Sequence, residues 1–135
     1  MQNSPLRNKS DMLIAAADLL HDKCYYPAVA HAAYYSCYQL LLYIWLHSMN
    51  KSQDELDTKT SQSQYGSHKY LLDEVLSYIS NLKQTNTDIR CLRNGIKELK
   101  RLRVEADYLD KDIDYTQSKQ SIELSKKLLL ILKRY

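Results

Sequence analysis

The chain has 135 residues with a formal net charge of +3, and it holds 12 Tyr but only 2 Gly, 2 Pro and no Phe. So few turn-forming residues argue against an all-β fold, because each hairpin needs them. So small a net charge does not by itself require a nucleic-acid partner. A chain of this length forms one domain. We therefore predict a single all-α domain over residues 1–135, an up-and-down bundle of about five helices.

The cysteines and the N-terminal residues indicate the compartment. Cys24, Cys37 and Cys91 are odd in number and follow no metal-ligand spacing, so we interpret them as reduced thiols that mostly serve in packing. The first ten residues lack the apolar core of a signal peptide. The sequence also lacks a Gly-rich phosphate loop, a zinc-binding spacing and a serine-nucleophile motif. These features predict a cytoplasmic protein without a metal or a cofactor.

The first predicted helix begins after Ser4, with Pro5 in its first turn, or alternatively takes Ser10 as its cap. It ends near Lys23. Its apolar stripe has helical spacing and consists of Leu6, Met12, Leu13, Ala16, Leu19 and Leu20. The link to the next helix is short, so the two helices should be antiparallel neighbours.

Residues 25–49 contain no Asp, Glu, Lys or Arg, and after Pro27, which suits a first helical turn, no Gly or Pro occurs until Gly66. A helix that is apolar nearly all round is either the centre of a bundle or a membrane span. Its many polar side chains, and apolar runs shorter than ~20 residues, argue against a span. We predict the central helix of the bundle, with one face formed by His31, Tyr34, Tyr35, Tyr38, Leu42 and Trp45.

Residues 50–64 are polar apart from Leu56, and we predict a long mobile loop here. Gly66 then marks the start of a third helix, with Ser67 as its N-cap. A turn follows at residues 81–86. The buried stripe of the third helix is predicted to be Leu71, Leu72, Val75, Leu76 and Ile79.

The fourth predicted helix spans residues 87–108 and carries the main charge pattern. A threonine followed by an acid suits its N-terminus, and it continues through Gly95 at a cost of ~1 kcal/mol relative to Ala. Beside its apolar stripe runs a basic stripe, which is typical either of a surface for phosphate backbones or of a solvated helix face. The members of this basic stripe are Arg90, Arg93, Lys97, Lys100 and Arg101.

An acidic segment at residues 110–115 leads to a fifth helix, which is capped by Thr116 or Ser118. The segment lacks the Gly and the distal Glu of a calcium loop, so we interpret it as a solvated turn. The fifth helix is predicted to pack on the bundle through Ile122, Leu124, Leu128, Leu129, Ile131 and Leu132.

Arg103 differs from the basic stripe because it falls in the apolar sector of its helix. A buried guanidinium needs acceptors, and the candidates are Asp107, one turn on, and the Tyr hydroxyls and His31 of the central helix. Arg103 is then either part of a structural ion pair or a ligand for a phosphate or carboxylate in a cleft. His31 and Tyr35 are one turn apart and can touch. His68 lies beside a lysine at a helix start, where it either helps to bind an anion or is simply exposed.

Two stretches together resemble a known family. Tyr26–Gln39 is similar to the Ala-rich second helix, with its Tyr-Tyr pair, of small prokaryotic HEPN proteins. Leu102–Tyr108 is similar to the Arg-x-x-Ala-Asp-Tyr signature late in the same proteins. The spacing and the amphipathic closing helix also fit, so the resemblance covers most of the chain. The residues that match the signatures are Tyr34, Tyr35, Arg103, Asp107 and Tyr108.

The resemblance implies a helical bundle that is commonly a homodimer, is often encoded beside a minimal nucleotidyltransferase in a toxin–antitoxin pair, and binds or cuts RNA. HEPN nucleases carry a His a few positions after the Arg, whereas here Tyr108 follows and no His occurs after His68. We therefore expect a non-catalytic module that binds RNA or a nucleotidyltransferase. The alternatives are a metal-independent endoribonuclease that uses Arg103 with Tyr108 or His31, and a purely structural dimeric scaffold.

Overall fold

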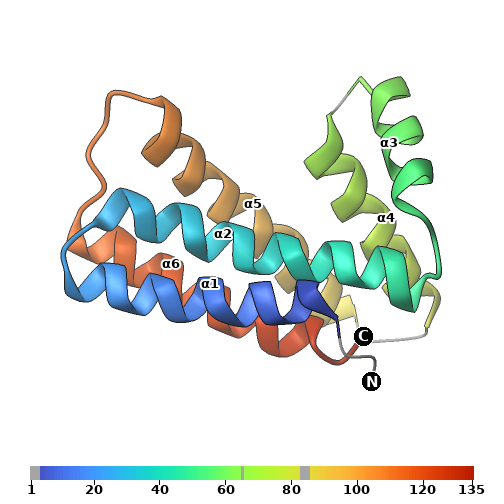
Figure 1. The fold of residues 1–135 in the computed structure, drawn as a ribbon, viewed down its shortest axis with the longest axis horizontal. Helices are drawn as coiled ribbons and strands as arrows, with labels where there is room; N and C mark the ends of the chain where they lie inside the picture. The colour runs from blue at the N-terminus through green and yellow to red at the C-terminus, as the bar shows by residue number, and fades with distance from the viewer. Residues whose placement is uncertain (1–3, 65, 83–85) are drawn as a thin grey trace.

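The computed structural model describes residues 4–64, 66–82 and 86–135 (Figure 1). This part of the chain contains six α-helices, one turn of π-helix and no strand, which confirms the all-α prediction. In chain order the elements are α1 (Pro5–Asp22), α2 (Tyr26–Tyr43), η1 (Ile44–Ser48), α3 (Gln53–Gln62), α4 (Ser67–Asn81), α5 (Asn86–Tyr108) and α6 (Tyr115–Leu132).

Helix α2 is the centre of the bundle, as its lack of charge predicted. It contacts α1, α4, α5 and α6, and α1 and α6 run beside it in Figure 1. The core around it includes Leu40, Leu41 and Trp45, each at most 2% exposed. The predicted helix over 25–49 changes from α to π geometry at η1. None of the described helices combines the length and the apolar character needed to cross a bilayer.

The three cysteines are free thiols in different surroundings. Cys37 is buried, and burial raises the pKa of its thiol to about 12, so this cysteine serves in packing as predicted. Cys91 is partly buried, whereas Cys24 is exposed in the turn after α1, where its φ is +63°. The packing prediction therefore does not hold for Cys24.

The start of α1 distinguishes the two predicted caps. The hydroxyl of Ser4 accepts a hydrogen bond from the N–H of Leu6 at 3.2 Å, and Pro5 occupies the first turn. Ser10 is fully buried and donates instead to the carbonyl oxygen of Ser36 in α2 at 2.7 Å. Ser4 is therefore the cap, and Ser10 joins α1 to the central helix.

The prediction of a loop at residues 50–64 is wrong, because α3 forms there. Ser52 caps this helix by accepting a first-turn N–H at 3.0 Å, and two acids in the first turn suit the helix dipole. The indole N–H of Trp45 donates to the carbonyl oxygen of Ser52 at 2.9 Å, and Leu56 is buried against the core. The Ser52 cap and the buried Leu56 side chain therefore stabilise α3, although the rest of this helix is polar.

Two other helix starts also differ from prediction. Gly66, with φ of +83°, takes the N-cap position of α4 in place of Ser67, and it provides no side-chain cap. Asp114 caps α6 in place of Thr116 or Ser118, because its carboxylate accepts the N–H of the third helical residue at 2.8 Å in a complete capping box. Ser118 is buried and bonds to Nδ1 of His21 at 2.8 Å. Part of the predicted turn at 81–86 lies outside the described residues.

Gly95 marks the closest approach of α5 to α6. A Cβ atom at this position would lie 2.7 Å from Cδ2 of Leu128, which is fully buried. The missing side chain therefore allows the two helices to pack closely, and this explains a glycine in the middle of a long helix.

A larger side chain at this contact should destabilise the bundle. We expect Gly95→Val to lower the free energy of unfolding by about 1–3 kcal/mol, because the added carbons overpack a filled core. Urea unfolding measures the change. Asn94→Val is the matched control, since Asn94 is exposed on the same helix. Equal stability of the two variants would contradict the close-packing explanation.

Candidate functional site

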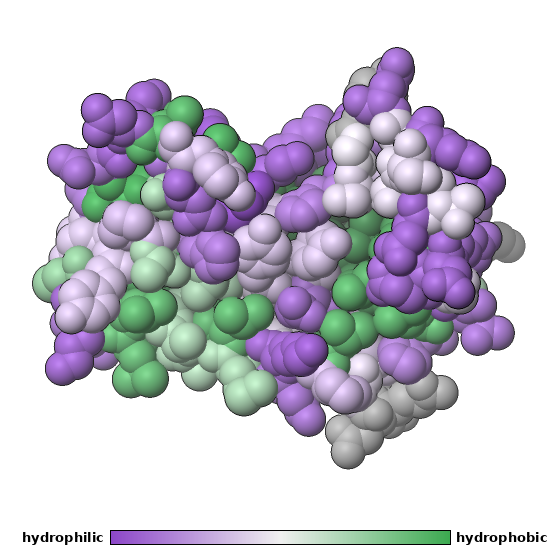
Figure 2. Space-filling model, turned by 45° about the horizontal axis from the view of Figure 1, so that its top comes forward, coloured by the Kyte–Doolittle hydropathy of each residue, from purple (hydrophilic) through white to green (hydrophobic). Residues whose placement is uncertain are grey.

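A hollow opens between the raised end of α5 and the pair of helices α3 and α4 (Figure 2). Within this region lies a cavity of about 180 Å³ whose lining comes from α2, α4 and α5. We call this cavity the cleft. It is lined by Tyr34, His68, Lys69, Leu72, Asp73, Ile96, Lys97 and Lys100.

Arg103 is buried beside the cleft, as predicted from its position in the apolar sector of α5. The residue is only 7% exposed. Its Cζ lies 5.1 Å from the ring centre of Tyr34, 5.4 Å from that of Tyr35 and 5.6 Å from that of Tyr108. Aromatic faces attract a cation at these distances. Three tyrosine rings therefore surround the guanidinium.

The guanidinium has two of its three predicted partners. Nη1 donates to the hydroxyl of Tyr35 at 3.3 Å and lies 3.8 Å from Oδ2 of Asp107. His31 forms no hydrogen bond with the guanidinium. Its Nδ1 is instead hydrogen-bonded to the same Asp107 oxygen at 2.8 Å. Among the described residues, Nε of Arg103 is buried without an acceptor. The result is a chain of polar contacts that runs from Arg103 through Asp107 to His31.

His31 lies at the accessible end of this chain. Its side chain is 50% exposed, whereas that of Asp107 is 22% exposed. Its ring centre lies 4.7 Å from that of Tyr35, which confirms the contact expected one helical turn apart. Asp107 therefore orients a histidine at the surface while it faces a buried arginine, and this pairing resembles the base-and-orienter pairs of many active sites.

Tyr108 covers Arg103 from the outside. Tyr108 is 72% exposed. It is the last residue of α5, as predicted. The ring contributes its face to the guanidinium, while the rest of it is open to solvent. A ligand could therefore reach this ring without any movement of the helices.

His68 joins the cleft through a contact that its position in the sequence does not reveal. Its Nδ1 lies 2.7 Å from the hydroxyl of Tyr34, which is 34 positions away. Its ring also packs 4.6 Å from the ring centre of Tyr38. Burial lowers the pKa of His68, and the charges of Arg103 and Lys100 lower it further. His68 is therefore neutral at neutral pH.

The state of Tyr34 determines which ring nitrogen of His68 carries the proton. Burial raises the pKa of the Tyr34 hydroxyl far above its ordinary value, so the hydroxyl stays protonated. The hydroxyl has no other hydrogen-bond partner among the described residues, so we assign its proton to the contact with Nδ1 of His68, which then accepts it. A neutral imidazole that accepts at Nδ1 carries its hydrogen on Nε2. His68 therefore has one remaining polar group, an Nε2–H donor.

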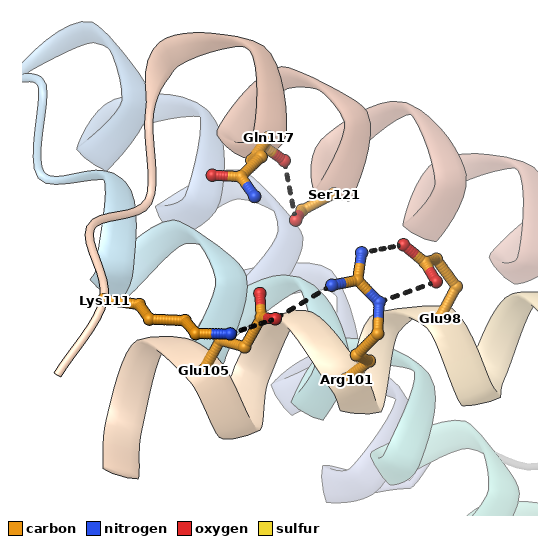
Figure 3. A network of polar contacts seen from close by, with 6 residues as sticks. All are labelled: Glu98, Arg101, Glu105, Lys111, Gln117 and Ser121. Carbon is orange, nitrogen blue, oxygen red and sulfur yellow. Dashed lines mark hydrogen bonds and ion pairs between the residues drawn. The ribbon is translucent and has the colours of Figure 1, made fainter. Parts of the chain in front are cut away.

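The structure divides the predicted basic stripe into parts with different surroundings. Arg101 donates to Glu98 and also to Glu105, at 3.0 Å, and Lys111 lies 3.8 Å from the same Glu105 oxygen (Figure 3). This network of charges lies between α5 and the start of α6 (Figure 3). Its glutamates neutralise much of the Arg101 charge.

The other members of the stripe are not neutralised in this way. Lys97 and Lys100 line the cleft, and neither forms an ion pair with an acid in the part of the chain that the structure describes. Arg90 and Arg93 are exposed nearer the start of α5, beside a shallow depression. The unneutralised lysines are therefore the ones that face α4 across the cleft.

Comparisons of the chain with protein-family models, with curated proteins and with solved structures find no significant match. Across the described ranges, no three His, Cys, Asp or Glu side chains are grouped so that they could hold a metal ion. The side chains at the site and beside it include a buried guanidinium, three lysines, two histidines, two aspartates and several tyrosine rings. Such a set can bind an anion and pack against an aromatic or planar group.

His68→Gln should change how stability depends on pH. The ordinary histidine pKa is ~6.5, and burial holds that of folded His68 lower. The unfolded chain therefore binds the proton more readily, so His68 contributes stability above about pH 6.5 that is lost as the pH falls. We expect the free energy of unfolding to fall less in His68→Gln than in the wild-type protein between about pH 7.5 and about pH 5.5.

Urea unfolding at both pH values provides the measurement. His47→Gln is the control, because His47 is exposed and does not line the cleft. If His68→Gln and the wild-type protein lose the same stability over this interval, the neutral state assigned to His68 is wrong.

Proposed function

We propose that the chain is a HEPN-like helical module that binds single-stranded RNA at the cleft and does not cut it. The observation that carries this proposal is the pair Lys97 and Lys100, whose charges line the cleft without an acidic partner among the described residues. Unneutralised cations along a groove are what a phosphate backbone needs. Of the basic stripe, we therefore assign RNA binding to the two lysines on the side of α5 that faces α4.

The exposed aromatic ring beside Arg103 supports a single strand as the ligand. Proteins that bind single strands combine a cationic groove with rings on which bases stack, each stack contributing about 1–3 kcal/mol. Tyr108 is largely exposed and lies over Arg103, so its outer face is open to a base. Duplex RNA offers no unstacked bases for such a ring.

The resemblance to HEPN proteins supports the same proposal from another direction. Tyr34, Tyr35, Arg103, Asp107 and Tyr108 match the family signatures, and all five lie at or beside one buried guanidinium. No histidine follows Arg103 in the sequence, and this favours binding without cleavage.

The proposal also includes the partners that the resemblance implies, a second copy of the chain and a nucleotidyltransferase. Apolar side chains at the surface of α1 and α6 could meet such a partner. Met12 and Leu19 of α1 are 63% and 69% exposed, and Leu130 of α6 is 69% exposed. These residues do not line the cleft, so a partner there would leave RNA binding open.

The double variant Lys97→Glu/Lys100→Glu should weaken RNA binding by about tenfold or more at low salt and reduce the dependence of log K on log salt by about 1.4, because two lysine charges that neutralise phosphate charge are lost. Fluorescence anisotropy with a labelled single-stranded RNA measures both effects. Lys9→Glu/Lys119→Glu is the matched control, since it changes the net charge equally at exposed positions on α1 and α6.

Three results are informative. A loss confined to the cleft variant supports the proposal. An equal loss in both variants shows that net charge, and not the cleft, determines binding. If the wild-type protein binds no single-stranded RNA at low salt, the proposal fails and the structural dimeric scaffold becomes the better interpretation.

A metal-independent endoribonuclease is the second candidate, and the contact between His31 and Asp107 favours it. The histidine is oriented by Asp107 and half-exposed, and histidine is the side chain that most often serves as a general base. Arg103 would stabilise charge on the phosphate, and Tyr108 lies next to it.

Incubation with RNA in the presence of EDTA distinguishes the two candidates. We expect the purified protein to leave RNA intact, because no histidine follows Arg103. Cleavage that persists in EDTA, that is lost in a folded His31→Asn variant and that survives in the exposed control His47→Asn would reject our proposal. The same result would establish the endoribonuclease in its place.

A further inference from the structure

The cleft contains a set of nitrogen donors that converge from two helices. Lys97 and Lys100 come from α5, and His68 and Lys69 come from the first turn of α4. Asp73, the acid that the cavity lining contains, is 2.8 Å from Nζ of Lys69 and therefore offsets that lysine's charge. Two lysine charges remain, together with the Nε2–H donor of His68. This count matches a ligand with two negative charges.

The start of α4 adds to the same electrostatic preference. Its N-cap residue, Gly66, has no side chain that could accept the first N–H groups of the helix. Space around this glycine is open, because nothing lies within 4 Å of where a Cβ would be. The dipole of the helix favours an anion at such an end. The helix dipole therefore adds to the preference for anions that the cationic side chains already give the cavity.

The size of the cavity limits what it can hold. Its volume is about 180 Å³. Sites for drug-sized ligands start at ~300 Å³. The cavity is therefore smaller than such sites, and its size suits one phosphoryl group with its immediate neighbours.

We propose that the cleft binds one phosphomonoester group through Lys97, Lys100 and the Nε2–H of His68. A monoester carries up to two negative charges at neutral pH, whereas an internal phosphodiester of RNA carries one. Side chains of three helices line the cavity, and the second charge of a monoester matches its two lysine charges. The phosphoryl group can belong to the end of an RNA or to free phosphate. In the first case the inference rests on the proposed function.

Three ligands test the inference with the wild-type protein. They are a single-stranded RNA with a 5′-phosphate, the same RNA with a 5′-hydroxyl, and inorganic phosphate. We expect the phosphorylated RNA to bind about tenfold more tightly than the hydroxyl form, since its terminal monoester brings a second negative charge and further acceptor oxygens to the cleft. Inorganic phosphate should compete with the 5′-phosphate for the cleft and so reduce this difference in affinity. It should also shift the ring signals of His68 in an NMR titration at constant ionic strength, with chloride as the control salt.

His68→Gln should reduce the preference for the phosphorylated RNA, and His47→Gln should keep it. Circular dichroism confirms that both variants are folded. Equal binding of the two RNAs by the wild-type protein, without a phosphate-induced shift at His68, would overturn the inference and leave RNA binding at the cleft intact. Binding of phosphate without binding of either RNA would instead support the pocket and reject the proposed function.

Discussion

The rest of this structure depends on how the Arg103 guanidinium is accommodated in the interior. A buried charge is costly unless it is paired and hydrogen-bonded. Here the compensation comes from a tyrosine hydroxyl, a carboxylate and three aromatic faces. Because most of these groups belong to α2, the buried charge fixes the position of α5 against the central helix. This accommodation explains why α2 is rich in tyrosine, since Tyr combines an apolar ring that packs in the core with a hydroxyl that can accept a hydrogen bond from Arg103.

Charge is distributed unequally around α5. On the side toward α6, glutamates one turn before and one turn after Arg101 surround its guanidinium. On the side toward α4, Lys97 and Lys100 remain without such partners among the described residues. The glutamates thereby limit the cationic surface of the helix to the side that lines the cleft. One helix therefore contributes to the core, to a surface ion-pair network and to the candidate binding surface.

The candidate site was only partly predictable. The position of Arg103 in an apolar sector predicted its burial, and Asp107 and the tyrosines were predicted as its partners. The role of His68 is not predictable from the sequence, because its contact with Tyr34 joins two helices that are far apart in the sequence. The division of the basic stripe was also not predictable. It depends on which neighbouring helix each side of α5 faces, and helical spacing alone does not contain that information.

By itself the sequence determined the helical class, the central place of α2 and the burial of Arg103, because these follow from composition and from periodicity along single helices. Only the tertiary structure decided that residues 50–64 contain α3, since Leu56 and the Trp45 contact anchor a segment whose composition favours a loop. It also decided that Ser118 packs against His21 while Asp114 caps α6. A polar side chain can satisfy a helix end or a distant partner, and only the packing of the helices selects between them.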